Sequence, residues 1–206
     1  MEDVLELYAT PPEPKRPLVC LDEKSVQLLM DLRPPRPVGP EHPRRVDYTY
    51  KRNGTRNLFM FFAPGTGWRH VQVTAQRTKL DFAHCLKELV DVHFPEAEVI
   101  RLVVDNLNTH TPAVLYEAFE PAEAQRILSH LEFHYTPKHG SWLNMAEIEI
   151  AMLAKQCLDR RLPDEVRLAA EVGAWAAWRN EQRATVTWQF TTLDARTKLK
   201  HLYPHN

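Results

Sequence analysis

Apolar positions in the first half of the chain follow the two-residue period of β-strands. LVCLDEK (18–24) has the character of a short buried strand, and the following SVQLLMDL fits either a helical turn or a strand extension. β-Branched and aromatic runs then occupy 45–53, 56–65 and 69–78, with turn signals in RNGT and APGTGW between them. We therefore expect an antiparallel meander in this part of the chain.

In the second half of the chain, strand-like segments alternate with segments whose apolar residues follow the 3.6-residue period of an α-helix. Strands are predicted at 98–106 and 131–137, and apolar residues spaced three to four apart predict a helix at 79–94. Prolines near the first turn open short helices at 111–119 and 121–130, further helices are predicted at 141–158 and 163–182, and 191–203 closes the chain. This order predicts an α/β fold in which helices cover the faces of a mixed sheet.

Proline content and length set the domain organisation. Four prolines fall between residues 9 and 17, a density that neither a helix nor a central strand tolerates. We interpret 1–17 as an N-terminal extension or linker and 18–206 as one domain, a length that supports a sizeable core. No apolar run reaches the roughly 20 residues of a membrane helix. Three separated cysteines suggest reduced thiols, so we expect a cytoplasmic protein with no membrane partner.

Charge is distributed unevenly, although the net charge is only −1. Residues 32–80 contain ten basic and two acidic residues, which gives this segment +8 and leaves −9 for the rest. A polyanionic partner such as DNA explains this asymmetry, and a solvated face balanced by acidic neighbours is the alternative. The RNGT stretch with its basic flanks predicts a clamp on the DNA backbone. The candidate DNA-binding residues are Arg44, Arg45, Lys51, Arg52, Arg56, Arg69, Arg77 and Lys79.

Three carboxylates occupy positions that can bring them together. Asp22 lies in the first strand, Asp105 ends the strand at 98–106, and Glu147 lies near the start of the helix at 141–158. Sites in open α/β sheets form at strand ends. Adjacent carboxylates repel, and a hard cation such as Mg²⁺ relieves that repulsion while keeping positions for water and phosphate. Two such ions can promote phosphoryl transfer.

The surroundings of these acids resemble the motifs of DDE transposases of the mariner-like superfamily, in particular the IS-six-thirty type of bacterial insertion sequence. DNLNTH around Asp105 resembles the second motif, PKHGSWLNMAE before and including Glu147 the third, and CLDEK around Asp22 the first. The tail WQFTTLDARTKLKHLYP is also similar to that branch. The resemblance covers nearly the whole chain from about residue 15.

This resemblance implies a ribonuclease-H-like fold with a five-stranded mixed sheet, three strands antiparallel and two parallel. It implies that Asp22, Asp105 and Glu147 are catalytic and bind two Mg²⁺ or Mn²⁺ ions. The implied reaction is hydrolysis at transposon ends followed by strand transfer into target DNA, in which water and then a DNA 3′-hydroxyl attack. The implied partner is DNA, held by a homodimer, with no small-molecule substrate. A bacterial, nucleoid-associated location follows from the same resemblance.

Neighbouring residues compete for, or support, these roles. Glu23 would point away from Asp22 across the strand, and Glu149 lies roughly 200° from Glu147 around the helix, so we prefer Asp22 and Glu147. We expect Asn106, His110 and Asn144 to orient the metal ligands or to contact DNA. His110, His130, His134, His139 and Cys157 match no common zinc-ligand spacing.

Two departures from the family pattern leave the function open. Asp105 and Glu147 are separated by 42 positions, about two helical turns more than in typical relatives. Only about 17 residues precede the first strand, whereas full-length relatives carry N-terminal helix-turn-helix modules. We therefore expect a catalytic fragment, one product of a split gene or a decayed element. The alternatives to a transposase domain are a nuclease without transposition, or an inactive remnant or regulator that binds DNA or a complete transposase.

Overall fold

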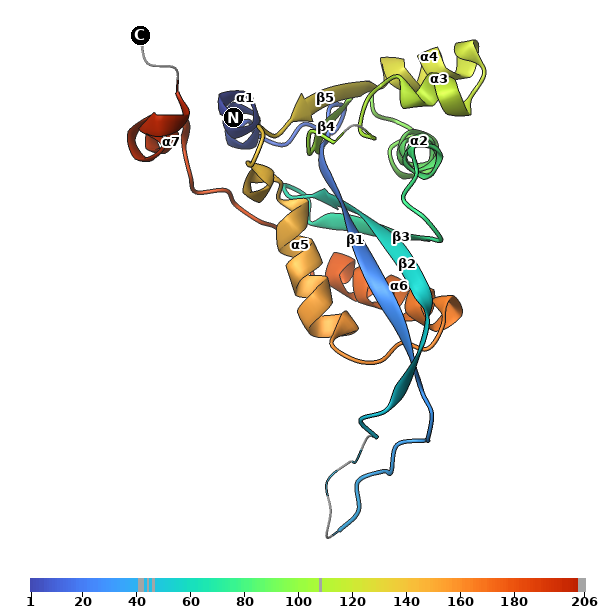
Figure 1. The fold of residues 1–206 in the computed structure, drawn as a ribbon. Coiled ribbons are helices and arrows are strands. Elements are labelled where there is room, and N and C mark those ends of the chain that lie inside the picture. The colour runs from blue at the N-terminus through green and yellow to red at the C-terminus, as the bar shows by residue number, and fades with distance from the viewer. Residues whose placement is uncertain (41–42, 44, 46, 108, 204–206) are drawn as a thin grey trace.

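A five-stranded mixed sheet forms the centre of the computed structural model, which describes residues 1–206 except 41–42, 44, 46, 108 and 204–206 (Figure 1). The strands are β1 (Leu18–Asp31), β2 (Tyr50–Ala63), β3 (Trp68–Thr74), β4 (Ile100–Val104) and β5 (Leu131–Tyr135). Their order is β3-β2-β1-β4-β5, with β1, β2 and β3 antiparallel and β4 and β5 parallel to β1. The predicted ribonuclease-H-like sheet is confirmed.

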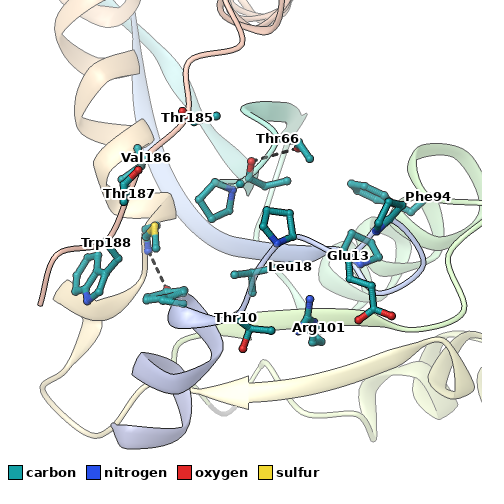
Figure 2. A pocket seen from close by; sticks show the side chains of 18 residues that line it. Thr10, Glu13, Leu18, Thr66, Phe94, Arg101, Thr185, Val186, Thr187 and Trp188 are labelled. Atoms are coloured by element: carbon teal, nitrogen blue, oxygen red, sulfur yellow. Dashed lines mark hydrogen bonds between the residues drawn. The ribbon is translucent and has the colours of Figure 1, made fainter. Parts of the chain in front are cut away.

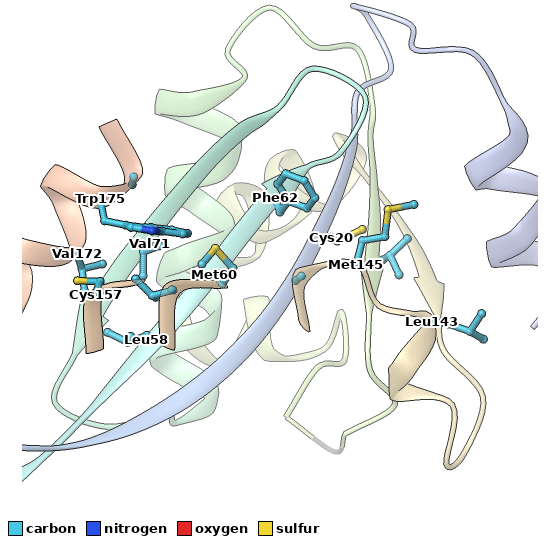
Figure 3. Close-up of a cluster of buried hydrophobic side chains, with 14 of the residues drawn as sticks. Cys20, Leu58, Met60, Phe62, Val71, Leu143, Met145, Cys157, Val172 and Trp175 are labelled. Carbon is cyan, nitrogen blue, oxygen red and sulfur yellow. The ribbon is translucent and has the colours of Figure 1, made fainter. Parts of the chain in front are cut away.

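Helices cover both faces of this sheet, and the alternation of strand side chains creates two cores. The helices are α1 (Glu2–Ala9), α2 (Lys79–Glu88), α3 (Val114–Ala118), α4 (Pro121–Ser129), α5 (Ala146–Leu153), α6 (Glu165–Glu181) and α7 (Thr192–Lys198). Cys20, Met60 and Phe62 lie in the core beneath α1, α5, α6 and α7 (Figure 3). Val19 and Leu21 belong to the core beneath α2, α3 and α4.

The β1–β2 hairpin extends well beyond the rest of the sheet (Figure 1). SVQLLMDL continues β1 as a strand extension, which was one of the two predicted options. The predicted turn at RNGT is wrong, because these residues lie inside β2. The pairing register shifts opposite this stretch, between Gln27 and Leu29, and Gly54 has a φ of 90°. Glycine accepts this conformation without strain, so RNGT bends a continuous strand instead of reversing the chain.

The N-terminal segment, predicted as an extension or linker, begins with a packed helix. Val4, Leu5 and Leu7 of α1 are buried, and the Tyr8 hydroxyl donates to the carbonyl oxygen of Leu143 at 2.6 Å. The proline-rich residues 10–17 then lead into β1. Within the part of the chain that the structure describes, no helix is long and apolar enough to cross a membrane.

Candidate active site

Asp22 and Glu23 lie on opposite faces of β1, because successive strand side chains alternate. Asp22 follows Cys20 on the α5 side, and Glu23 follows Leu21 on the α2 side. The Asp22 carboxylate accepts the backbone N–H of Glu23 at 2.7 Å, and among the described residues no cationic side chain pairs with it. Burial raises the pKa of Asp22 to about 7, and the charges of Asp105, Glu147 and Glu23 add to that rise.

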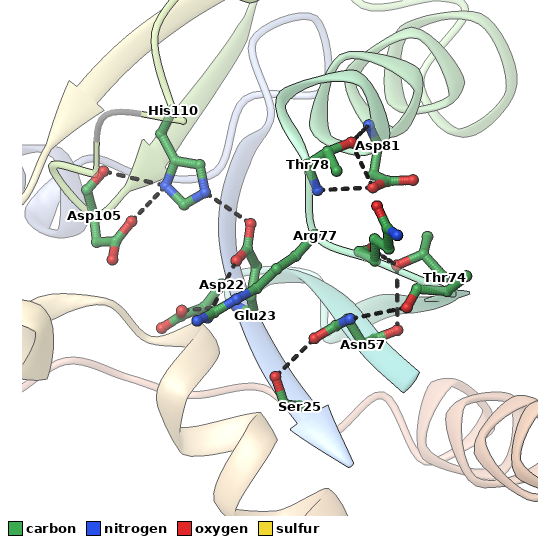
Figure 4. A network of polar contacts seen from close by, with 12 residues as sticks. Asp22, Glu23, Ser25, Asn57, Thr74, Arg77, Thr78, Asp81, Asp105 and His110 are labelled. Atoms are coloured by element: carbon green, nitrogen blue, oxygen red, sulfur yellow. Dashed lines mark hydrogen bonds and ion pairs between the residues drawn. The ribbon is translucent and has the colours of Figure 1, made fainter. Parts of the chain in front are cut away.

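Glu23 reaches Asp105 through His110, in a chain of contacts that crosses from β1 to the loop after β4 (Figure 4). His110 Nε2 lies 2.9 Å from Glu23 Oε1, and its Nδ1 contacts the Asp105 carboxylate. The imidazole is fully buried and stacks on Phe82 with ring centroids 4.5 Å apart. The Tyr135 hydroxyl donates a hydrogen bond to the backbone carbonyl of His110 at 2.9 Å. Burial alone would lower the His110 pKa, but the two carboxylates raise it to about 9.

His110 therefore fixes one oxygen of Asp105, and the two carboxylates favour its protonated form. The expectation that His110 orients Asp105 agrees with this contact, whereas its burial leaves it no surface for DNA. Glu23 was considered only as a rival to Asp22, and its part in holding His110 was missed. The one feature of the sequence that could have indicated this role is that Glu23 lies on the opposite face of the strand from Asp22.

The two acids of α5 have opposite environments. Glu147, in the first turn of the helix, is exposed. Glu149 is fully buried and forms ion pairs with Arg69 at 2.9 Å and with Arg179 at 2.6 Å. Glu149 thus ties α5 to β3 and α6, and its charge is already compensated. Of the two, Glu147 has the free carboxylate that can approach Asp22.

Asn144 fastens the start of α5 to β1. Its side chain is fully buried, donates to the Leu21 carbonyl at 2.8 Å and accepts the backbone N–H of Ala146 at 3.1 Å. These bonds link the residue before Asp22 to the helical turn that carries Glu147. A buried side chain with both amide groups engaged does not contact DNA, so Asn144 is a positioning residue. Asn106, beside Asp105, is exposed.

The three predicted carboxylates share one site without converging tightly. Asp105 and Glu147 are both close enough to raise the pKa of Asp22. In the described part of the chain, the only three acidic or histidine side chains with donor atoms all within 4.8 Å of one another are His70, Glu88 and His93. Asp22, Asp105 and Glu147 offer the oxygen ligands that Mg²⁺ and Mn²⁺ prefer, and the repulsion of Asp22 by the other two is what a divalent cation would relieve.

The basic segment is partly neutralised by acids from elsewhere in the chain. Arg56 pairs with Glu165 at 2.6 Å and Lys79 with Glu117 at 2.9 Å, and Arg77 lies 3.8 Å from Glu23. Outside the masked positions, exposed basic side chains with no carboxylate partner remain on the hairpin and its loop, at Arg36, Arg45, Lys51 and Arg52. The free positive charge is thus concentrated where the hairpin projects.

Arg69 corrects the predicted DNA-binding set. Its side chain is 1 % exposed, pairs with Glu149, and donates to the Ala184 carbonyl at 2.7 Å. DNA cannot reach a guanidinium enclosed in this way. Arg44, also predicted to contact DNA, lies outside the described residues.

A hollow of about 420 Å³ lies apart from the carboxylates. Figure 2 shows its walls, which come from the proline-rich segment after α1, the β2–β3 turn and residues 185–188. None of Asp22, Asp105 and Glu147 lines it.

Comparison with known proteins agrees with this geometry. Residues 17–169 match the family described as "DDE superfamily endonuclease". No curated protein matches. Among solved structures, the Mos1 mariner paired-end complex with Mn is similar with a TM-score of 0.59, at 14% identity over 88% of this chain and 54% of that one. A pre-cleavage Mos1 transpososome has a TM-score of 0.56, at 13% identity over 88% of this chain and 58% of that one. The chain thus spans little more than half the length of these transposases.

Proposed function

Because this chain belongs to the DDE superfamily of endonucleases, we propose that it is the catalytic domain of a transposase that cuts DNA at transposon ends and joins them to target DNA. One observation carries the proposal. Asp105 and Glu147 lie close enough to Asp22 for their charges to raise its pKa, and among the described residues neither Asp22 nor Glu147 has a cationic partner. Asp105 shares the single imidazole of His110 with Glu23, whereas Glu149 is neutralised by Arg69 and Arg179. We place the chain in the IS-six-thirty-type branch on its three motifs.

In the proposed site, some side chains bind metal ions and others position those ligands. Asp22, Asp105 and Glu147 would hold two Mg²⁺ or Mn²⁺ ions, which when bound activate the attacking oxygen and stabilise the leaving one. His110 and Glu23 fix the direction of the Asp105 carboxylate. Asn144 fixes α5, and hence Glu147, relative to β1. Since water and a DNA 3′-hydroxyl are the attacking groups, these residues need only bind, orient and tune charge.

The partners proposed are transposon-end and target DNA, bound by a homodimer in the cytoplasm of a bacterium and on its nucleoid. The transposon-end complex among the similar structures supports a DNA partner: a Mos1 transposase paired-end complex with left transposon end has a TM-score of 0.55, at 14% identity over 82% of this chain and 52% of that one. The projecting hairpin with its unpaired basic residues is the surface we assign to DNA (Figure 1).

Nicking of supercoiled plasmid tests the catalytic proposal. Wild type should nick DNA only with Mg²⁺ or Mn²⁺, and Asp105→Ala and Glu147→Ala should each lose this activity, because each removes a carboxylate from the metal site. Glu181→Ala removes an exposed carboxylate from α6 and serves as the control. Metal-independent nicking, or nicking that survives in both triad variants, would contradict the proposal. Joining of a 3′-hydroxyl oligonucleotide to plasmid separates a transposase from a simple nuclease.

DNA binding is expected to depend on the hairpin. Replacing both Lys51 and Arg52 by alanine removes two phosphate contacts, so the slope of log affinity against log salt should fall by about two, with no change in sequence preference. Fluorescence anisotropy over a salt series measures the slope. The double variant Lys198→Ala/Lys200→Ala, in the α7 region far from the hairpin, removes the same charge (Figure 1). Equal slopes in the two double variants would rule out the hairpin as the DNA surface.

A further inference from the structure

A second group of ligand side chains lies away from the acidic site, between β3 and the end of α2. His70 belongs to β3, Glu88 ends α2, and His93 ends the π-helical turn η1 (Leu89–His93). Their donor atoms all lie within 4.8 Å of one another. His70 Nε2 is 3.6 Å and His93 Nε2 is 3.4 Å from the same oxygen, Glu88 Oε1.

The π-helical turn is what brings Glu88 and His93 to one side. In an α-helix, residues five apart are about 140° apart around the axis and do not meet. The hydrogen bond from Phe94 N–H to the Leu89 carbonyl, at 3.0 Å, spans five residues and widens this turn. A π-turn of this kind is rare and is found frequently at functional sites. Glu88 and His93 then converge on His70 from the sheet.

Both imidazole nitrogens that face Glu88 lack a hydrogen-bond partner. His70 Nε2 and His93 Nε2 are buried, and neither forms a hydrogen bond of acceptable geometry among the described residues. Buried polar atoms in native proteins are nearly always paired, so two orphaned nitrogens aimed at one carboxylate require an explanation. Burial also lowers the pKa of both histidines, which favours the neutral form that binds metal ions.

The spacing of these atoms fits a tetrahedral metal site. Zn²⁺ takes His nitrogen at about 2.0–2.1 Å and carboxylate oxygen at about 2.0–2.2 Å, so neighbouring ligands of a tetrahedron lie about 3.4 Å apart. The two separations from Glu88 Oε1 are close to this value. Imidazole with one carboxylate favours zinc-like transition metals over Mg²⁺.

We propose that His70, Glu88 and His93 bind a transition-metal ion of the Zn²⁺ class, with the fourth position left to water. The site is reachable from solvent, since the three side chains are 31%, 34% and 16% exposed. An ion there links edge strand β3 to the end of α2 and stabilises that junction by binding the folded state alone. This site is separate from the carboxylate site proposed for DNA cleavage.

Titration with Zn²⁺ and Co²⁺ tests the site in the full chain after chelator treatment. Wild type should show the visible absorption of tetrahedral Co²⁺ and unfold at a higher temperature with Zn²⁺. Co²⁺ should also quench Trp68, whose ring centroid is 5.1 Å from that of His93, and Trp68→Phe should lose that quenching. Asp105→Ala should keep all these signals, because it removes a carboxylate only from the other site.

Variants decide whether these residues are the ligands. Glu88→Gln and His93→Ala should weaken Zn²⁺ binding by more than the 10–100-fold that loss of an outer partner costs. His84→Ala removes an exposed histidine from the same helix and should bind like wild type. Circular dichroism verifies folding, and Glu88→Gln preserves side-chain shape. Absence of tetrahedral Co²⁺ absorption in wild type, or an unchanged affinity in folded Glu88→Gln, would overturn the proposal.

Discussion

Replacing Glu149 by alanine is expected to destabilise the fold by about 3–5 kcal/mol, because Arg69 and Arg179 lose the anion that compensates their buried charge. Glu149 and Arg69 are fully enclosed, and Arg179 is 14% exposed. Solvent therefore cannot replace the missing carboxylate. The measurement is urea unfolding, with a lower midpoint at an unchanged slope.

Glu147→Ala is the matched control for Glu149→Ala, since it makes the same change two residues earlier on the same helix. Glu147 is exposed, so its loss should alter stability by no more than about 0.5 kcal/mol. The two variants should therefore differ in what they lose: Glu147→Ala should lose nicking activity, and Glu149→Ala should lose folding stability. A stability cost shared equally by both variants would mean that the structure assigns the wrong acid to the ion-pair cluster.

Asp22→Asn is expected to gain stability and lose activity at once. The pKa of Asp22 rises from 3.8 to about 7 on folding, so the folded state binds more protons than the unfolded state between these values. Stability contributed by the protonated form is present at pH 4 and is lost as the pH rises through 7. Asparagine mimics the protonated form and keeps an acceptor for the Glu23 N–H. Without divalent cations the variant should therefore be more stable at pH 8, by about 1–3 kcal/mol after solvent screening, and equal at pH 4.

Urea unfolding from pH 4 to 8 in chelator measures the Asp22 effect, and Mg²⁺ provides a second test. The metal should stabilise wild type but not Asp22→Asn, since it binds only a complete folded site. Nicking by the variant should fall by more than the 10–100-fold that loss of an outer partner of a metal costs. Equal stability of the two proteins at pH 8 in chelator would contradict the raised pKa of Asp22. Retained nicking, or equal stabilisation of both proteins by Mg²⁺, would show that Asp22 is not a metal ligand.

Local sequence patterns predicted the sheet and most helices, because a strand or helix that is buried on one face has apolar residues at a regular spacing. The predicted helix at 79–94 occurs as α2 followed by the π-turn η1, a distinction that apolar spacing does not encode. The failure at RNGT has a similar cause: its residues suit a turn, but pairing with β1 across a bulge keeps them in β2. The predicted balance of charge was partly right, since several basic residues find acids from distant helices and others stay free on the hairpin.

The sequence by itself determined the elements, their order and the three motifs, because these depend on residue periodicity and short spacings. Only the tertiary structure decided which acids are free. The positive charge of Arg69 led to its predicted contact with DNA, yet Arg69 is buried because Glu149, eighty positions later, supplies its counter-charge. Glu23 likewise meets His110 only because β1 and β4 are adjacent. Electrostatic compensation depends on distance in space, and the sequence does not state that distance.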